Sequence, residues 1–173
     1  MTESEIFEAV TGSGSSDFAV LARILNTHGR WCLIGGLAVN CYVEPVYTLD
    51  ADIVVIAAEL EAIRNELTAA GFVVEEFAHS VNAQMPGSDL RIQLTIDPRY
   101  QEFLNGVELR EVLGERVPVA SLENVTRGKV WAWQDPNRRA TKRKKDELDL
   151  MRILERYPIL RDLMPREIQN LVP

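Results

Sequence analysis

The sequence has few of the residues on which thiolate metal sites and disulfide frameworks depend. Its 173 residues include two cysteines and two histidines. Cys32 and Cys41 lack the spacing of a metal site and lie in apolar surroundings, which favours buried, reduced thiols over a disulfide. His28 stands at the expected end of a helix and His79 precedes a polar loop. We assign neither histidine a catalytic role.

Long apolar runs are also missing. No segment approaches the ~18 consecutive apolar residues that a membrane-spanning helix needs. The first ten residues, MTESEIFEAV, are acidic and amphipathic, whereas a secretion signal carries positive charge before an apolar block. We therefore expect a cytoplasmic protein with no membrane partner.

Positive charge is scarce over the chain as a whole. Nineteen lysines and arginines face 26 acidic residues, for a net charge of −7. This balance argues against broad, nonspecific affinity for nucleic acid. One local exception is RRATKRKK, from Arg138 to Lys145, which holds six basic residues. They cannot all share one helix face, and basic residues before acidic ones oppose the helix dipole. A solvated helix start and a binding surface for RNA or nucleotide phosphates both remain open for this segment.

Apolar periodicity predicts a mixed order of helices and strands. Helices are expected at residues 3–10, 18–29, 37–43, 59–71, 121–133 and 141–157. The second of these helices would be capped by Ser16 or Asp17 and end at Gly29. Strands are expected at residues 31–34, 51–57, 72–77 and 90–97, with a polar loop at 82–89 and a hairpin around Gly114.

This order predicts an α/β (α+β) fold, in which a mixed sheet is flanked by helices and followed by a helical C-terminal portion. The length suits one domain with an appendage. We expect residues 1–120 to form the core with its N-terminal helices. Residues 121–173 would form a helical extension packed on that core.

The most informative stretch is TLDADIVV, where Asp50 and Asp52 stand at the start of an otherwise apolar strand. Residues two apart on a strand point to the same face. The two carboxylates repel each other there, and one or two divalent cations would offset that repulsion. A hydrated strand end is the simpler interpretation of this pair taken alone.

A second motif lies upstream, where Gly35 and Gly36 follow a strand and open a helix. Bare backbone amides at such a turn can approach a phosphate closely. A tight turn is again the simpler interpretation of the glycines alone. A phosphate-binding turn beside paired carboxylates is what metal-dependent nucleotidyl transfer requires, so the order of the two motifs favours a nucleotide site.

With TLDAD following the two glycines, the sequence resembles the nucleotidyltransferase fold of the DNA polymerase β superfamily. Within it, small prokaryotic AbiEii-toxin-like nucleotidyltransferases are the most similar. Their later motifs are matched by KVWA, which begins at Lys129, and by RATKRKKD, which ends at Asp146. The resemblance spans about residues 31–150.

The resemblance implies roles for individual residues. Gly35, Gly36, Thr48, Gln93 and Lys129 would bind the nucleotide. Asp50 and Asp52 would hold Mg²⁺ or Mn²⁺ and act in catalysis, with Asp146 as a further functional acid.

Two positions depart from the family pattern. Active members place a third carboxylate on a neighbouring strand, where this chain has Gln93, an amide that can ligate a metal but cannot act as a base. Asp89 and Asp97 are each four residues away from it, about 13 Å along a strand. In addition, Glu123 replaces a lysine of the toxin-type members.

We predict a metal-dependent nucleotidyltransferase that moves a nucleoside monophosphate (NMP) from a metal-bound NTP to a hydroxyl of RNA, protein or a small molecule. The alternative is a catalytically impaired nucleotide- or partner-binding relative, such as a component of a toxin–antitoxin system with a cognate partner. A third class, an interaction domain that binds no nucleotide, also stays open. Among the remaining residues, Trp131 and Trp133 are expected in the core, and Asp149 and Glu155 on the surface.

Overall fold

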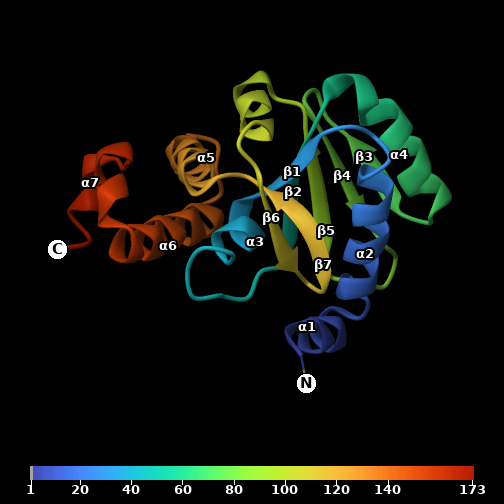
Figure 1. Ribbon diagram of the computed structural model, residues 1–173, viewed down its shortest axis with the longest axis horizontal. Helices are drawn as coiled ribbons and strands as arrows, with labels where there is room; N and C mark the ends of the chain where they lie inside the picture. The colour runs from blue at the N-terminus through green and yellow to red at the C-terminus, as the bar shows by residue number, and fades with distance from the viewer. Residues whose placement is uncertain (1) are drawn as a thin grey trace.

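The computed structural model describes residues 2–173 and centres on one seven-stranded sheet. The strand order is β3-β4-β5-β2-β1-β7-β6 (Figure 1). The strands are β1 (Trp31–Ile34), β2 (Asp50–Val55), β3 (Val73–Glu76), β4 (Ser80–Gln84), β5 (Arg91–Thr95), β6 (Glu108–Val112) and β7 (Glu115–Val119). Strand β2 pairs antiparallel with β1 and parallel with β5, so the predicted mixed sheet is confirmed.

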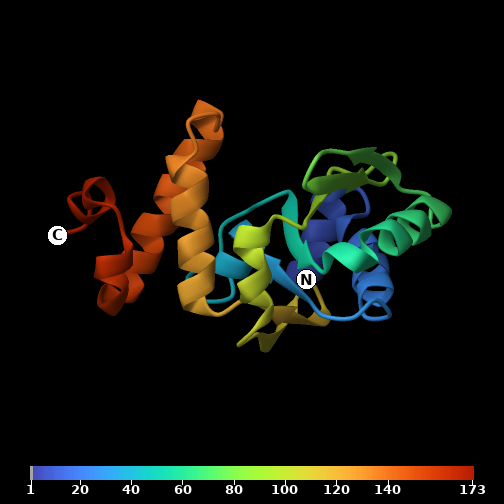
Figure 2. The ribbon, with the colours of Figure 1, turned by 90° about the horizontal axis from the view of Figure 1, so that it is seen from above.

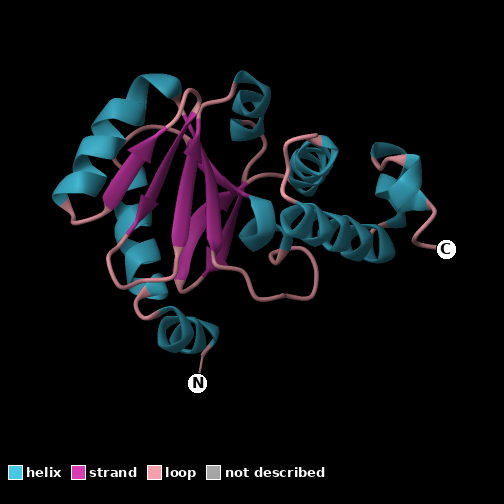
Figure 3. Ribbon diagram, turned by 180° about the vertical axis from the view of Figure 1, so that it is seen from behind, coloured by secondary structure: helices cyan, strands magenta, loops and turns pink. Residues whose placement is uncertain are grey.

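Helices flank this sheet on two sides. They are α1 (Glu3–Thr11), α2 (Gly14–Leu25), α3 (Gly35–Val39), α4 (Leu60–Ala69), α5 (Leu122–Gln134), α6 (Ala140–Arg156) and α7 (Arg166–Gln169). Short 3₁₀ helices occur at η1 (Ala57–Glu59), η2 (Pro98–Leu104) and η3 (Pro158–Leu163). Helices α2 and α4 lie on one side of the sheet, and α5, α6 and α7 lie on the other, with the C-terminus farthest out (Figures 2 and 3).

Strand β2 occupies the middle of the sheet because its apolar side chains are buried from both faces. Ala51, Ile53, Val54 and Val55 are at most 1% exposed. Only Asp50 and Asp52 keep partial exposure along this strand. The prediction of a central strand with two acids on one face is therefore confirmed.

Two local predictions are wrong. Helix α2 begins at Gly14 after Ser13 and ends at Leu25, whereas we expected a cap at Ser16 or Asp17 and an end at Gly29. Its first turn is fixed earlier, because the Gly14 amide donates to the Thr11 hydroxyl at the end of α1. Gly29 instead lies in the following loop with a φ of +75°.

The second error concerns the expected polar loop at residues 82–89, whose first part belongs to β4. Val81 and Ala83 of this strand are buried, and β4 pairs antiparallel with both β3 and β5. Two flanking partners stabilise a strand that has few β-branched residues of its own.

The remaining predictions concern the thiols, the tryptophans and the membrane. Both cysteines are free, and burial raises the pKa of Cys32 to about 12. Trp131 and Trp133 are partly buried against the core, as expected. Within residues 2–173, we find no helix with the length and apolar character to span a bilayer. The division of the chain near residue 120 into core and extension stays a prediction.

Candidate active site

The sheet register places the two acids of β2 beside polar residues of β5. Asp52 is level with Ile34 at the end of β1 and with Gln93 on β5, and Asp50 is level with Arg91. Gln93 therefore lies directly beside Asp52, at the strand position where a third carboxylate was expected. The next strand adds Asn82, which is level with Gln93. These side chains form a polar row across the open face of the sheet.

The glycines lie against this row. Gly35 has a φ of +71°, and a Cβ atom there would be 2.2 Å from Oδ2 of Asp52. A Cβ at Gly36 would be 3.3 Å from the Thr48 hydroxyl oxygen, which accepts a hydrogen bond from the Asp50 amide at 3.3 Å. Only glycine at position 35 allows the backbone to approach the carboxylate so closely.

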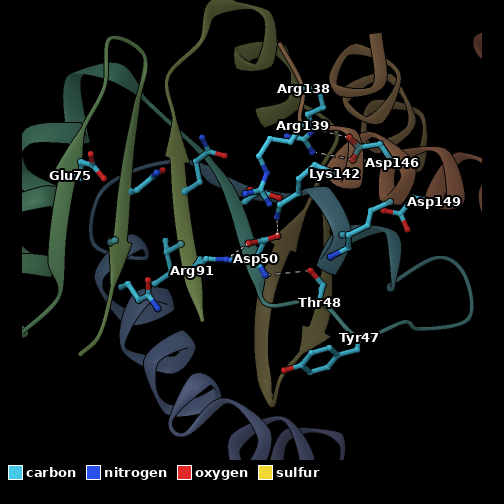
Figure 4. A pocket seen from close by; sticks show the side chains of 18 of the residues that line it. Tyr47, Thr48, Asp50, Glu75, Arg91, Arg138, Arg139, Lys142, Asp146 and Asp149 are labelled. Carbon is cyan, nitrogen blue, oxygen red and sulfur yellow. Dashed lines mark hydrogen bonds and ion pairs between the residues drawn. The ribbon is translucent and has the colours of Figure 1, made fainter. Parts of the chain in front are cut away.

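Asp50 is paired with two cations. Arg91 Nε lies 2.7 Å from its Oδ1, and the Lys142 ammonium contacts its Oδ2 (Figure 4). Burial is the largest single influence on the pKa of Asp50 and would raise it. The hydrogen bonds from Lys142 and Arg91 together outweigh burial and hold this pKa below its usual value.

Asp52 has a different environment. Within residues 2–173 it forms no ion pair, and burial raises the pKa of this carboxyl. The Asp50 carboxylate raises the pKa further, while the positive charge of Lys129 opposes the shift. The two acids thus differ: Asp50 is paired with two protein cations, whereas Asp52 is influenced by Lys129 without forming an ion pair in the described residues.

Lys129 anchors a buried ionic network between α5 and α6. Its ammonium lies 3.0 Å from Oδ1 of Asp146 and 2.8 Å from Oδ2 of Asp149. Arg138 donates a 2.8 Å hydrogen bond from Nε to Oδ2 of Asp146, and Arg152 lies 2.7 Å from Asp149. Burial lowers the pKa of Lys129, but the charges of Asp149 and Asp146 outweigh it and raise the pKa.

The expectation that Asp149 is a surface residue is wrong, because Lys129 and Arg152 bind it and it is 6% exposed. Its signal was the spacing of three residues from Asp146, which places both acids on one face of a helix. Glu155, in contrast, is exposed as predicted.

A cavity of about 620 Å³ brings most of these residues together (Figure 4). Of the residues proposed from the sequence, it is lined by Gly36, Thr48, Asp50, Asp52, Gln93, Lys129 and Asp146. Gly35 lines an adjoining cavity of about 270 Å³. The two cavities share Asp52, Gln93, Lys129, Arg138 and Asp146. All eight residues that the sequence singled out therefore converge on one region.

The basic segment contributes to this region unevenly. Arg138, Arg139, Lys142 and Lys145 line the larger cavity, whereas Lys144 is paired with Glu147 at 2.9 Å and is 77% exposed. As predicted, the six basic side chains do not share one face. Sequence reasoning did not single out Arg91, Arg138 or Lys142 as individual site residues.

The oxygen ligands at this site are of the type that binds a divalent cation, although there are two carboxylates rather than the expected three. Asp50, Asp52 and the Gln93 amide supply oxygen ligands of the kind that Mg²⁺ prefers. Within residues 2–173, no group of three or more acids, histidines or cysteines is arranged to hold a metal. Asp97 lines the smaller cavity but is paired with Arg99 at 2.9 Å. Asp89 is exposed and lines neither cavity, so neither acid replaces the missing third carboxylate.

Comparison with known proteins identifies the fold. No family model and no curated protein sequence matches the chain. Among solved structures, ANT(2")-Ia in complex with adenylyl-2"-tobramycin is similar with a TM-score of 0.57 and 18% identity, over 91% of this chain and 93% of that one. The lincosamide antibiotic adenylyltransferase LnuA, bound to lincomycin, has a TM-score of 0.53 and 13% identity, over 79% and 94%.

A nucleotidyltransferase described as putative from H. pylori has a TM-score of 0.53 and 16% identity, over 90% of this chain and 71% of that one. The chain therefore has the nucleotidyltransferase fold expected from its motifs.

Proposed function

We propose that this protein is a metal-dependent nucleotidyltransferase, which transfers an NMP from an NTP to a hydroxyl group. The observation that carries the proposal is the contact between the Gly35–Gly36 turn and the acids of β2. A Cβ at Gly35 would lie 2.2 Å from the Asp52 carboxylate. This leaves bare backbone beside a paired-carboxylate edge, at the point where two cavities meet.

The roles follow from the position of each residue. Asp50 and Asp52, with the Gln93 amide, would hold Mg²⁺ or Mn²⁺. Such an ion, when bound, lowers the pKa of an attacking hydroxyl and neutralises the departing pyrophosphate. The Gly35–Gly36 turn and Thr48 would contact the triphosphate.

Lys129 and Asp146 would act as a unit. Because Asp146 is 1% exposed and is bonded to both Lys129 and Arg138, we assign it the role of positioning these cations. Lys129 and Arg138 line both cavities, where they would face the phosphates. Because Asp52 and Gln93 line both cavities, the NTP and the hydroxyl acceptor could each approach these residues from a different cavity.

The acceptor class is the finer part of the proposal. An AbiEii-like role predicts an RNA or protein acceptor and a cognate toxin or antitoxin partner, and Arg139 and Lys145 at the cavity support an acceptor that carries phosphate. The solved structures of similar fold hold adenylyl-2"-tobramycin and lincomycin, which favours a small molecule. A test of the proposal therefore needs acceptors of both classes.

A second function is favoured by Gln93. The neutral amide lies level with Asp52 and cannot accept the proton of an attacking hydroxyl. Under this alternative, the protein binds nucleotide without transferring it and acts through a partner. Tight, metal-dependent NTP binding without any labelled product would support it.

Incubation with each α-labelled NTP, Mg²⁺ or Mn²⁺, and either total RNA or a panel of hydroxyl-bearing small molecules tests the proposal. We expect label in one acceptor fraction. Asp50→Asn and Asp52→Asn should each reduce labelling by at least about 100-fold, since even outer-shell changes at metal sites cost 10–100-fold. Asp89→Asn, an exposed acid outside both cavities, is the control. Unchanged labelling in the Asp50 and Asp52 variants would exclude a role for these acids in transfer.

A further inference from the structure

Helix α6 reaches across the site to the metal-binding edge through Lys142. This residue is 92 positions after Asp50 in the chain, yet its ammonium contacts Oδ2 of that carboxylate. Oδ1 is held by Arg91 at 2.7 Å. Both oxygens of one proposed metal ligand are therefore occupied by cations of the protein itself.

The two cations differ in how readily they can leave. Arg91 belongs to the strand next to β2, and its backbone is level with Asp50. It binds from a fixed register through a rigid, planar guanidinium. Lys142 is a point charge at the end of a flexible four-carbon chain and comes from a different layer of the fold. Lys142 is therefore the contact that can be exchanged.

The Lys142 ammonium has a second possible binding partner, a phosphate bound in the basic part of the larger cavity. Lys142 and Lys145 on α6, together with Arg139 at its N-cap, recur every three residues, and all three line the larger cavity. Such spacing brings side chains to neighbouring positions on one helix face. Phosphate oxygens in that cavity would be within the same basic surroundings that Lys142 already occupies.

We propose that Lys142 is an exchangeable counter-cation, which neutralises Asp50 in the nucleotide-free protein and moves to the phosphates when a metal–nucleotide complex enters. The inference rests on the proposed nucleotide function and adds a specific residue to it. Lys142 and a divalent cation then compete for Oδ2 of Asp50. Metal alone binds weakly, and the NTP favours metal binding by drawing Lys142 away from Asp50. By linkage, the metal favours NTP binding to the same extent.

The test is direct binding of Mn²⁺ to the nucleotide-free protein, measured by the electron paramagnetic resonance signal of free Mn²⁺. Lys142→Met should bind Mn²⁺ several-fold to roughly tenfold more tightly than the wild type, because a partly buried ion pair no longer competes. Lys145→Met removes the same charge from the same cavity, but within residues 2–173 Lys145 has no ion pair. It should shift the affinity less than twofold.

A second measurement tests whether Lys142 binds the phosphates. Titration with inorganic tripolyphosphate in the absence of metal should show weaker binding to Lys142→Met than to the wild type. Lys142→Gln repeats both measurements in case the methionine variant is unstable, and thermal melting verifies that each variant folds. Mn²⁺ affinity that is unchanged or weaker in both folded variants would overturn the proposal. So would an equal gain in Lys145→Met, since that would show only the loss of a nearby charge.

These outcomes are separable from failure of the proposed function. A wild type that labels an acceptor, with Lys142 variants that gain no Mn²⁺ affinity, overturns the counter-cation role alone. Absence of Mn²⁺ binding in every variant overturns it together with the metal site, whereas nucleotide binding is judged separately by NTP titration.

Discussion

Asp50 and Asp52 stand two residues apart on β2, but their electrostatic surroundings differ. Asp50 is already neutralised by Arg91 and Lys142, and its pKa is lowered despite burial. Asp52 has a raised pKa and lies against Gly35. Protein cations pair directly with Asp50, whereas Lys129 acts on Asp52 only through its charge and without an ion pair in the described residues.

Gly35→Ala tests the contact at the residue scale. Alanine at a φ of +71° costs about 1–2 kcal/mol of backbone strain, and its Cβ would meet the Asp52 carboxylate at 2.2 Å. We expect a lower free energy of unfolding in urea and weaker Mg²⁺–NTP binding by calorimetry. Gly36→Ala lies in the same turn, but its φ is not positive and its Cβ would be 3.3 Å from the nearest atom, so we expect smaller losses of stability and of binding than at Gly35. Equal losses in the two variants would contradict the special role of position 35.

At this scale the sequence predicted local motifs better than distant pairs. Gly35, Gly36, Asp50 and Asp52 were recognisable because their spacing along the chain already carries the geometry. The contact of Lys142 with Asp50 could not be recognised from the sequence, because it depends on how α6 packs beside the sheet. The local spacing of residues cannot indicate an ion pair between side chains 92 positions apart in the chain.

At the scale of elements, α5 and α6 are joined by charge as well as by apolar packing. Lys129 on α5 binds Asp146 and Asp149 on α6. Val125 on α5 and Leu150 and Ile153 on α6 are all buried in the hydrophobic core. Trp133 adds a 3.3 Å hydrogen bond from its indole nitrogen to Glu147. The position of the basic segment at the cavity therefore depends on the network around Lys129.

Lys129→Met tests this coupling. Removing the ammonium leaves two buried carboxylates with less compensation, and breaking a buried pair typically costs about 3 kcal/mol or more. We expect a loss of this size in the free energy of urea unfolding. Lys144→Met, on α6, should change this free energy by less than about 0.5 kcal/mol, because the pair of Lys144 with Glu147 is exposed. If the two variants were equally stable, the network would not hold α5 to α6.

Sequence periodicity identified both of these helices, but not β4. Leu150 and Ile153 recur at helical spacing over several turns, which is a long signal. The strand SVNAQ offers two buried apolar side chains, Val81 and Ala83, beside a turn with proline and glycine. Its identity as a strand comes from β3 and β5 on either side, which is tertiary information that local pattern does not contain.

Across the whole molecule, hydrogen bonds connect the C-terminal helices to the sheet. The Tyr157 hydroxyl donates to the Tyr42 carbonyl at 2.8 Å, and the Tyr42 hydroxyl donates to the Ala120 carbonyl at 2.7 Å. Arg152 reaches from α6 to Oδ1 of Asn40 at 3.3 Å. Arg152 on α6 and Tyr157, which follows α6, therefore hold the start of the loop after α3 that leads to Thr48 and Asp50. A site divided between the sheet and these helices needs both parts folded together.

We therefore predict that residues 1–120 and 121–173 unfold in one transition. Trp31 lies on β1, whereas Trp131 and Trp133 lie on α5, so fluorescence can follow each part separately. Trp31→Phe reports on α5, and the double variant Trp131→Phe, Trp133→Phe reports on β1. We expect each fluorescence midpoint in urea to coincide with the circular dichroism midpoint of the same variant, as two-state unfolding requires.

An α5 fluorescence signal that is lost at a clearly lower urea concentration than the circular dichroism signal would show that the C-terminal helices unfold independently. In that case, nucleotide binding should disappear with the α5 signal, because Lys129 and Arg138 line both cavities.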